Sequence, residues 1–409
     1  MKRGYADLPL HYGTVPPWLA QRMCLLGGAI VEAIVIEYGR TALLQRLSDP
    51  FWFQSLGCVL GMDWHSSGIT TSVMNALKKA INKRSEELGI YVCGGRGKAS
   101  LQTPAELLAI AGRTGLNGDE LVKHSKLSAK VDNTAVQDGF QLYLHSFVVT
   151  KEGEWAVVQQ GMNPNERMAR RYHWLSSSIR SFMEEPHTSV CGRNQGLILN
   201  LTDKLATPTK EGILELTKET PDKLMREVSI ILPRHHEVKA EDVNLKRLGA
   251  ALILAHETNV SDMESLLLLE GVGPRTLQSL TLVSEVIHGT PSRFSDPARF
   301  SFAHGGKDGH PFPVPTSVYD ETIEVFDKAI RQAKLGDKDK SEALKNLSVI
   351  SQEMENGYTP NNYFDKLVEH ERNTSYKYGG KTVYGDAKKP KGKGGTQLSL
   401  WDEQSLFPD

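Results

Sequence analysis

The hydrophobic pattern of the chain changes at about residue 203, and this change limits the folds that it can adopt. Strand-like and helix-like stretches are mixed before this point, whereas helical spacing prevails after it. The chain has 409 residues, and domains usually contain about 100 to 200. We therefore predict an α+β protein with a mixed α/β domain over 1–205 that carries the catalytic site, a mostly α-helical domain over 206–372 and a flexible tail over 373–409.

Two local patterns in the first domain predict particular elements. Thr103 and Glu106 have the spacing of a capping box, which predicts a helix over residues 103–112. Two alternating runs, 139–149 and 155–160, are separated by a short polar segment and predict a β-hairpin. Simple alternation along the first run places three polar side chains on one face of the hairpin: Gln141, Tyr143 and His145.

Charge and cysteine content narrow the class of protein. Lys and Arg number 48 against 49 Asp and Glu, so nucleic-acid binding has to come from local patches and not from the net charge. The four cysteines are scattered, which fits a reducing cytoplasm and argues against a disulfide framework or a thiolate zinc site. The most apolar segment, 24–36, is too short to span a bilayer and is predicted to be a buried element, with no membrane as partner.

The segment 262–288 contains a motif that points to DNA. A run of leucines is followed by Glu-Gly-Val-Gly-Pro-Arg-Thr between two predicted helices, and this pattern resembles a helix-hairpin-helix motif. Glycines let the backbone approach a phosphate, and the helix that follows offers free amides to it. The predicted DNA contacts here are Gly271, Gly273, Arg275 and Thr276. The alternative is an ordinary turn between helices.

The C-terminal tail resembles the sliding-clamp-binding motif of bacterial replication and repair proteins. The motif uses a glutamine to fix the backbone and apolar anchors to fill pockets on the clamp. The predicted clamp contacts are Gln397, Leu398, Leu400 and Trp401. A basic Lys- and Gly-rich linker precedes them, which would leave the motif free to reach a partner. The alternative is that the tail docks on its own protein.

Two further basic groups are candidate phosphate contacts. Arg96 and Lys98 lie in a glycine-rich stretch that fails the Walker pattern, because alanine follows the lysine. Arg170 and Arg171 belong to a basic and aromatic stretch. The alternative for Arg96 and Lys98 is a solvated turn, and the alternative for Arg170 and Arg171 is an exposed helix face.

Cleavage of DNA would need oxygen ligands for Mg²⁺ or Mn²⁺ and a group that activates water. The predicted metal ligands are Asp63, Asp132 and Asp138, and the predicted catalytic residues are His65, Asp138, His145 and Gln159. In this mechanism, His145 or His65 is the base and metal-activated water attacks phosphorus. The alternatives are a helix cap with a satisfied histidine at 63–65 and a solvated sheet face in the hairpin.

Four histidines outside these clusters also stand near one another in pairs. They are His235, His236, His304 and His310. Their spacing matches neither a zinc finger nor a zincin, so a structural or DNA-proximal role is favoured over metal binding.

Three stretches together resemble a known family. They are Gly61-Met62-Asp63-Trp64-His65-Ser66-Ser67-Gly68, Val158-Gln159-Gln160-Gly161-Met162 and the glycine- and histidine-rich stretch over 300–310. The chain thereby resembles the bacterial and archaeal family called domain of unknown function 763, over about residues 1–370. The resemblance implies a DNA-linked role, nucleolytic in the simplest case, and supplies no catalytic residues.

The leading hypothesis is a cytoplasmic, nucleoid-associated protein of bacterial DNA repair or replication. It would be a Mg²⁺- or Mn²⁺-dependent DNA nuclease that the tail recruits to the sliding clamp, and a homodimer would suit two-strand chemistry. The alternative is a non-catalytic adaptor that bridges DNA and the clamp, since the strongest motifs are binding motifs. A third interpretation, a small-molecule enzyme, leaves the hairpin motif unexplained.

Overall fold

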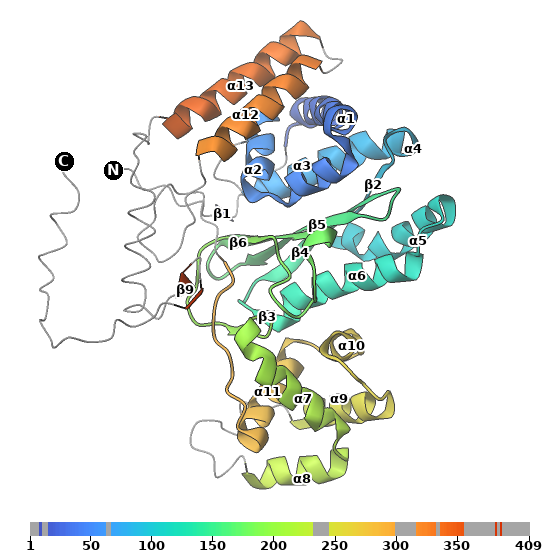
Figure 1. Ribbon diagram of the computed structural model, residues 1–409, viewed down its shortest axis with the longest axis vertical. Helices are drawn as coiled ribbons and strands as arrows, with labels where there is room; N and C mark the ends of the chain where they lie inside the picture. The colour runs from blue at the N-terminus through green and yellow to red at the C-terminus, as the bar shows by residue number, and fades with distance from the viewer. Residues whose placement is uncertain are drawn as a thin grey trace, which may run out of the picture. The chain divides into compact units, whose positions relative to one another are not determined.

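The structure, a computed structural model, describes residues 8–9, 15–62, 67–231, 245–298, 316–332, 336–355, 381–382 and 385–386 (Figure 1). The chain divides into two units. One comprises 1–306 and 311–357, and the other comprises 307–310 and 358–409. The described part of the second unit is the antiparallel pair β9 (Lys381–Thr382) and β10 (Gly385–Asp386). The first unit is built on an antiparallel sheet with helices, which confirms the predicted α+β class.

The main sheet has the strand order β1-β6-β5-β4-β2, and β7 pairs with β6 at the side. Every neighbouring pair is antiparallel. Its strands are β1 (Leu8–Pro9), β2 (Ile90–Arg96), β4 (Gln141–Thr150), β5 (Trp155–Asn163), β6 (Met168–Leu175) and β7 (Ser189–Cys191). A separate short pair is formed by β3 (Val136–Gln137) and β8 (Leu199–Asn200). The predicted hairpin is thus β4 and β5.

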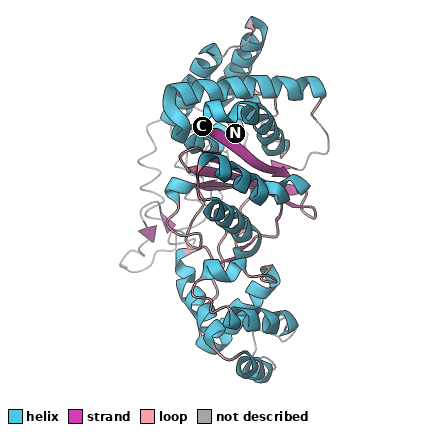
Figure 2. Cartoon of the chain, turned by 90° about the vertical axis from the view of Figure 1, so that its right-hand side faces the viewer, coloured by secondary structure: helices cyan, strands magenta, loops and turns pink. Residues whose placement is uncertain are grey.

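Helices cover both faces of the sheet (Figure 2). The first face is covered by α1 (Pro17–Ser48), α2 (Pro50–Val59), α3 (Gly68–Ile81), α12 (Thr316–Gln332) and α13 (Asp337–Glu355). Val148 and Val158 of the sheet join this core, and Trp52 of α2 stacks on Phe326 of α12 with ring centroids 4.9 Å apart. The short helix α4 (Ser85–Leu88) leads into β2 and ends at Gly89, which has a φ of 64°.

The second face is covered by α5 (Thr103–Thr114), α6 (Gly118–Lys130) and a π-helical turn (Val131–Ala135). Next to them lies a bundle of α7 (Thr207–Lys218), α8 (Pro221–Ile231), α9 (Leu245–Glu257), α10 (Met263–Leu268) and α11 (Pro274–His288). Phe147 and Val157 of the sheet share one core with Leu266 and Leu277 of this bundle. Of the helices predicted for residues 206–372, α7–α11 therefore form the bundle, whereas α12 and α13 pack on α1 and α2.

Helix α1 is the central helix of the first core. It is long and apolar enough to cross a membrane by length and composition alone. It nevertheless packs against α3, α12 and β5, and Ile30, Val31 and Ile34 are completely buried. The apolar segment 24–36, predicted to be a buried element, lies within this helix.

Two details differ from the sequence prediction. A β-bulge between Leu142 and Leu144 breaks the alternation of β4, so Tyr143 contacts Gln160 whereas His145 contacts Gln159. Adjacent residues of β5 point to opposite faces, so the prediction that Tyr143 and His145 share a face was wrong.

The predicted capping box is also absent, although the helix itself forms. The hydroxyl of Thr103 donates to the carbonyl of Ser100, and Glu106 bonds to the amide of Gly94 at 2.5 Å and to Lys78 at 2.6 Å. Glu106 therefore ties α5 to the end of β2 and does not cap its own helix.

Candidate nucleic-acid interface

The turn between α10 and α11, residues 269–273, is a hairpin held by buried apolar side chains. Leu266 and Leu267 before it, Val272 within it and Leu277 after it are almost completely buried. Gly271 has a φ of 81°, a left-handed conformation that favours glycine. Gly273 caps α11, and Pro274 supplies its first residue. The core thus fixes one side of the hairpin and leaves its glycine backbone on the other.

The glycine side of the hairpin is open. A Cβ atom added to Gly271 or to Gly273 would meet no heavy atom within 4 Å. In the part of the chain that the structure describes, the backbone amides of Gly271, Gly273 and Arg275 donate no hydrogen bond. Arg275 is exposed at the same place. Free amides at the start of a helix form a site for an anion.

Two side chains next to the π-helical turn hold the hairpin from behind. Lys130 Nζ donates to the carbonyl of Val272 at 2.7 Å, and Gln137 Nε2 donates to the carbonyl of Pro274 at 2.8 Å. Burial lowers the pKa of Lys130, which is half-buried. Among the described residues no carboxylate forms an ion pair with it. A cation without a counter-charge therefore lies against the hairpin backbone.

Thr276 has a different role from the predicted one. Its side chain is buried, and its hydroxyl donates to the carbonyl of Gly271 at 3.2 Å. It closes the hairpin from inside and does not present its hydroxyl to a ligand.

Asp132 lies at the centre of a buried network on the face of the sheet that α5 and α6 cover. Its Oδ2 accepts from Gln159 Nε2 at 2.6 Å and from Trp174 Nε1 at 3.0 Å, and its Oδ1 is 2.5 Å from His187 Nε2. Gln159 Oε1 in turn bonds to His145 Nδ1 at 2.8 Å. The carboxylate of Asp132 therefore already has three protein partners.

His145 has no free ring nitrogen to act as a base. Its Nε2 bonds to Ser125 Oγ at 2.8 Å, opposite the bond from Nδ1 to Gln159. Burial lowers its pKa from 6.5 to about 4, against a smaller raising effect of Gln159. His145 and Gln159 thus link the sheet to α6 and do not face solvent, which corrects their predicted catalytic roles.

Asp138 belongs to a second buried cluster. Its Oδ2 accepts from Arg170 Nη1 at 2.9 Å and from Tyr172 Oη at 2.6 Å, and its Oδ1 accepts from the amide of Phe140 at 3.0 Å. Arg170 also pairs with Asp296 at 2.7 Å. Mg²⁺ and Mn²⁺ need carboxylate oxygens that are open to the ion. Asp132 and Asp138 do not fit that requirement, so their predicted metal-binding role was wrong.

Arg170 and Arg171 are buried, which corrects their predicted role as DNA contacts. Adjacent residues of β6 point to opposite faces of the sheet, and helices cover both faces. Arg171 Nη1 donates to Gln54 Oε1 at 3.0 Å, and its Nε bonds to His173 Nε2 at 2.8 Å. Neither guanidinium reaches the surface.

Arg96 and Lys98 are exposed at the end of β2. The guanidinium of Arg96 lies 5.9 Å from the ring centroid of Tyr143. This loop remains available to a phosphate, but it belongs to a part of the fold other than the hairpin between α10 and α11.

Several predicted residues lie outside the described part of the chain. They are Asp63, His65, His235, His236, His304, His310, Gln397, Leu398, Leu400 and Trp401. Within the described residues no group of three or more His, Cys, Asp and Glu side chains could hold a metal ion.

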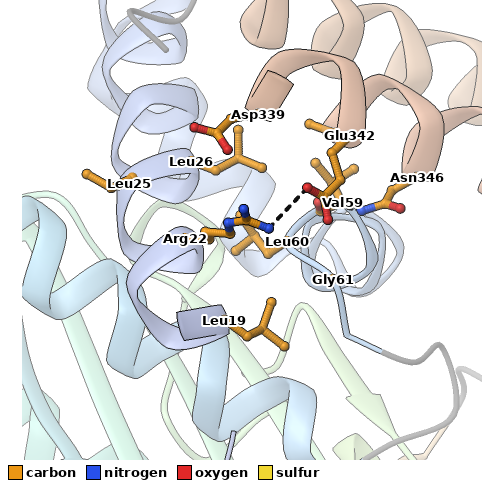
Figure 3. Close-up of a pocket in the computed structure, with 11 residues that line it drawn as sticks. Leu19, Arg22, Leu25, Leu26, Val59, Leu60, Gly61, Asp339, Glu342 and Asn346 are labelled. Carbon is orange, nitrogen blue, oxygen red and sulfur yellow. Dashed lines mark hydrogen bonds and ion pairs between the residues drawn. The ribbon is translucent and has the colours of Figure 1, made fainter. Parts of the chain in front are cut away.

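A pocket lies away from both the hairpin and the sheet network, between α1, α2 and α13 (Figure 3). Leucines line much of it, and Arg22 Nη1 pairs with Glu342 Oε2 across it at 3.2 Å. The pocket brings together none of the predicted site residues.

Sequence reasoning missed His187, Lys130 and Gln137. His187 has no local signal, because it meets Asp132 from 55 residues away in the chain. Lys130 did have one, since the lysines at 123, 126 and 130 have helical spacing.

Comparison with known proteins gives a family and no activity. The family model described as "Protein of unknown function (DUF763)" matches residues 4–314, which is more than half of the chain. The chain belongs to this family. No curated protein and no solved structure matches it significantly.

Proposed function

We propose that this member of the DUF763 family binds DNA through its hairpin, as an adaptor that contacts the phosphate backbone. One observation carries the proposal: three backbone amides without a hydrogen bond among the described residues, at Gly271, Gly273 and Arg275, lie in a hairpin whose Val272 carbonyl bonds to Lys130, a cation without a described carboxylate partner. Phosphate oxygens accept hydrogen bonds from such amides, and the positive end of the α11 dipole adds to the attraction. Contacts of this kind read no bases, so binding is independent of sequence.

The expected nuclease activity has less support than the adaptor. The carboxylates of Asp132 and Asp138 bond to protein donors inside the core, and His145 has no free nitrogen. The geometry on the described residues therefore favours the alternative hypothesis, in which the protein binds DNA without cutting it.

A mutation at Gly273 tests the binding site without straining the fold. Its φ of −132° suits any residue, and a methyl group there meets only open space, so Gly273→Ala leaves the protein folded. The methyl group would, however, stand where the phosphate approaches. Gly112→Ala on α5 is the matched control, because that glycine also has nothing within 4 Å of its added Cβ.

The assay is fluorescence anisotropy with two duplexes of unrelated sequence at one low salt concentration. We expect Gly273→Ala to weaken binding of both duplexes by at least about tenfold, because a hydrogen bond to a charged group contributes about 1.5–3 kcal/mol. We expect Gly112→Ala to match the wild type. Equal affinities for all three proteins would refute the site.

Incubation of labelled DNA with Mg²⁺, Mn²⁺ or EDTA tests the adaptor against the nuclease. The adaptor leaves the DNA intact in each case while still shifting it in a gel. Metal-dependent cleavage that Asp63→Ala abolishes would restore the nuclease hypothesis, with a site outside the described residues.

The sequence of the tail supports a proposed second partner, the bacterial sliding clamp. Its motif lies outside the described residues, so the proposal rests on the pattern Gln397-Leu398-Ser399-Leu400-Trp401. We expect the full-length protein to bind purified clamp and the double variant Leu400→Ala/Trp401→Ala to lose that binding while keeping its affinity for DNA. Equal clamp binding by both proteins would contradict this proposal.

A further inference from the structure

Helix α6 carries a row of three lysines. Lys123 and Lys126 are exposed, and Lys130 is the half-buried residue that bonds to the hairpin. Residues three, four and seven apart lie on one side of a helix. At a rise of about 1.5 Å per residue, the row is about 10 Å long.

The row follows α10 and ends at the hairpin. Lys130 at one end bonds to the carbonyl of Val272, which comes after α10. Lys123 at the other end lies near Asp262, which caps the start of α10. Burial raises the pKa of Asp262, but hydrogen bonds from Ser265 and the charge of Lys123 bring it below its usual value. Helices α6 and α10 pack against each other, with Lys123 at the start of α10 and Lys130 at the segment that follows it.

The charges of the row are largely uncompensated. Within the described part of the chain, none of the three lysines forms an ion pair with a carboxylate. Asp262 partly balances Lys123, whereas Lys126 forms no ion pair with a described carboxylate. A positive track thus extends from the hairpin along α6.

We propose that this lysine row is a second contact surface for the phosphate backbone of double-stranded DNA, continuous with the hairpin. The inference rests on the proposed function and extends it. The charges sit on one rigid helix, which matches the regular backbone of a duplex. The helix presents no aromatic ring to unpaired bases, and its His124 packs inward on Phe182 with ring centroids 5.3 Å apart. Single-strand sites normally use exposed aromatic rings.

The salt dependence of the binding constant reports how many phosphates a protein surface neutralises. For a duplex, each contact contributes about 0.9 to the slope of log K against log salt. The test compares the full-length wild type with Lys123→Gln/Lys126→Gln on a duplex and on a single strand of equal length. The matched control is Lys79→Gln/Lys83→Gln, which removes two exposed lysines on the other face of the sheet, one near the end of α3 and one in the 3-10 turn Asn82–Arg84 that follows it.

We expect the row variant to reduce the slope on the duplex by about 0.9 to 1.8, with the lower bound set by partial compensation of Lys123. The control should keep the wild-type slope. An unchanged slope in the row variant, or a reduction confined to the single strand, would overturn the inference.

The outcomes also separate the two proposals. If Gly273→Ala weakens binding and the row variant does not change the slope, the hairpin proposal stands and the row falls. If the row variant reduces the slope and Gly273→Ala has no effect, the row stands and the hairpin falls. A wild-type protein without affinity for duplex DNA overturns both.

Discussion

Arg170 is the best position at which to test the energetics of this fold. Its guanidinium is buried between two carboxylates, Asp138 at 2.9 Å and Asp296 at 2.7 Å. It also donates to the carbonyl of Arg193 at 2.6 Å. Asp296 follows α11 in the chain, so Arg170 ties the segment after the hairpin helix to the sheet.

The substitution Arg170→Met keeps an apolar stem and removes the charge. Two buried carboxylates then face each other without a cation. Removal of one partner from a buried ion pair costs about 3–5 kcal/mol, and we expect a loss of free energy of unfolding in that range. Protonation would relieve the repulsion, so the loss should be smaller at pH 5 than at pH 8.

Urea unfolding, followed by circular dichroism, measures the effect. Arg331→Met is the matched control, because its pair with Asp327 is on the surface at 2.7 Å, where solvent screens the two charges and the pair contributes little to stability. Adding Asp138→Asn and Asp296→Asn to Arg170→Met should recover part of the stability. If Arg170→Met loses no more than Arg331→Met, the assignment of a stabilising buried triad is wrong.

Three further predictions concern stability and use the same unfolding assay. Burial lowers the pKa of His145 from 6.5 to about 4, so the free energy of unfolding should fall as the pH falls from 6.5 to 4, by up to about 1.4 kcal/mol per pH unit. His145→Gln should remove this contribution to the pH dependence, and an unchanged pH dependence would contradict the prediction. Gly94→Ala should lower the free energy of unfolding by at least about 3 kcal/mol, because the φ of Gly94 is 80° and the new Cβ would lie 2.2 Å from the carbonyl oxygen of His145. The control Gly97→Ala, at a φ of 59° with open space around the Cβ, should lower it by about 1–2 kcal/mol. Equal losses for the two variants would refute the clash at Gly94. Asp262→Ala should cost about 1 kcal/mol, because Asp262 Oδ1 accepts from the amide of Ser265 at 2.7 Å, and no loss would show that this cap is not needed.

Local signals in the sequence predicted several elements of the fold, among them α5 and the hairpin of β4 and β5. The two alternating runs predicted β4 and β5, and the glycine-containing pattern within 262–288 predicted a helix on either side of it, which are α10 and α11. The β-bulge at Leu142–Leu144 was not predictable in this way, because an extra residue on one strand leaves the hydrophobic pattern almost intact. That bulge decided which polar side chains of β4 share a face.

Contacts with residues far away in the sequence determine whether the candidate site residues are buried or open to a ligand. Asp132 and Asp138 were sensible metal ligands by residue type, but their partners come from distant parts of the chain. Arg170 and Asp296 are 126 residues apart, and no local pattern connects them. The hairpin was predictable for the opposite reason, since its glycines, proline and flanking leucines are contiguous in sequence.

Hydrogen bonds and an ion pair connect the buried networks of the sheet to the hairpin. Lys130 and Gln137 stand on either side of the π-helical turn that carries Asp132, and both bond to carbonyls of the hairpin region. Beyond α11, Asp296 is bound to Arg170 inside the sheet. The hairpin helix is therefore attached to the sheet before and after its length. Binding loses affinity when it must first order a loop. If the proposed function holds, a hairpin fixed in this way would present its amides to phosphate at little entropic cost, and the buried carboxylates would support that binding as structural groups.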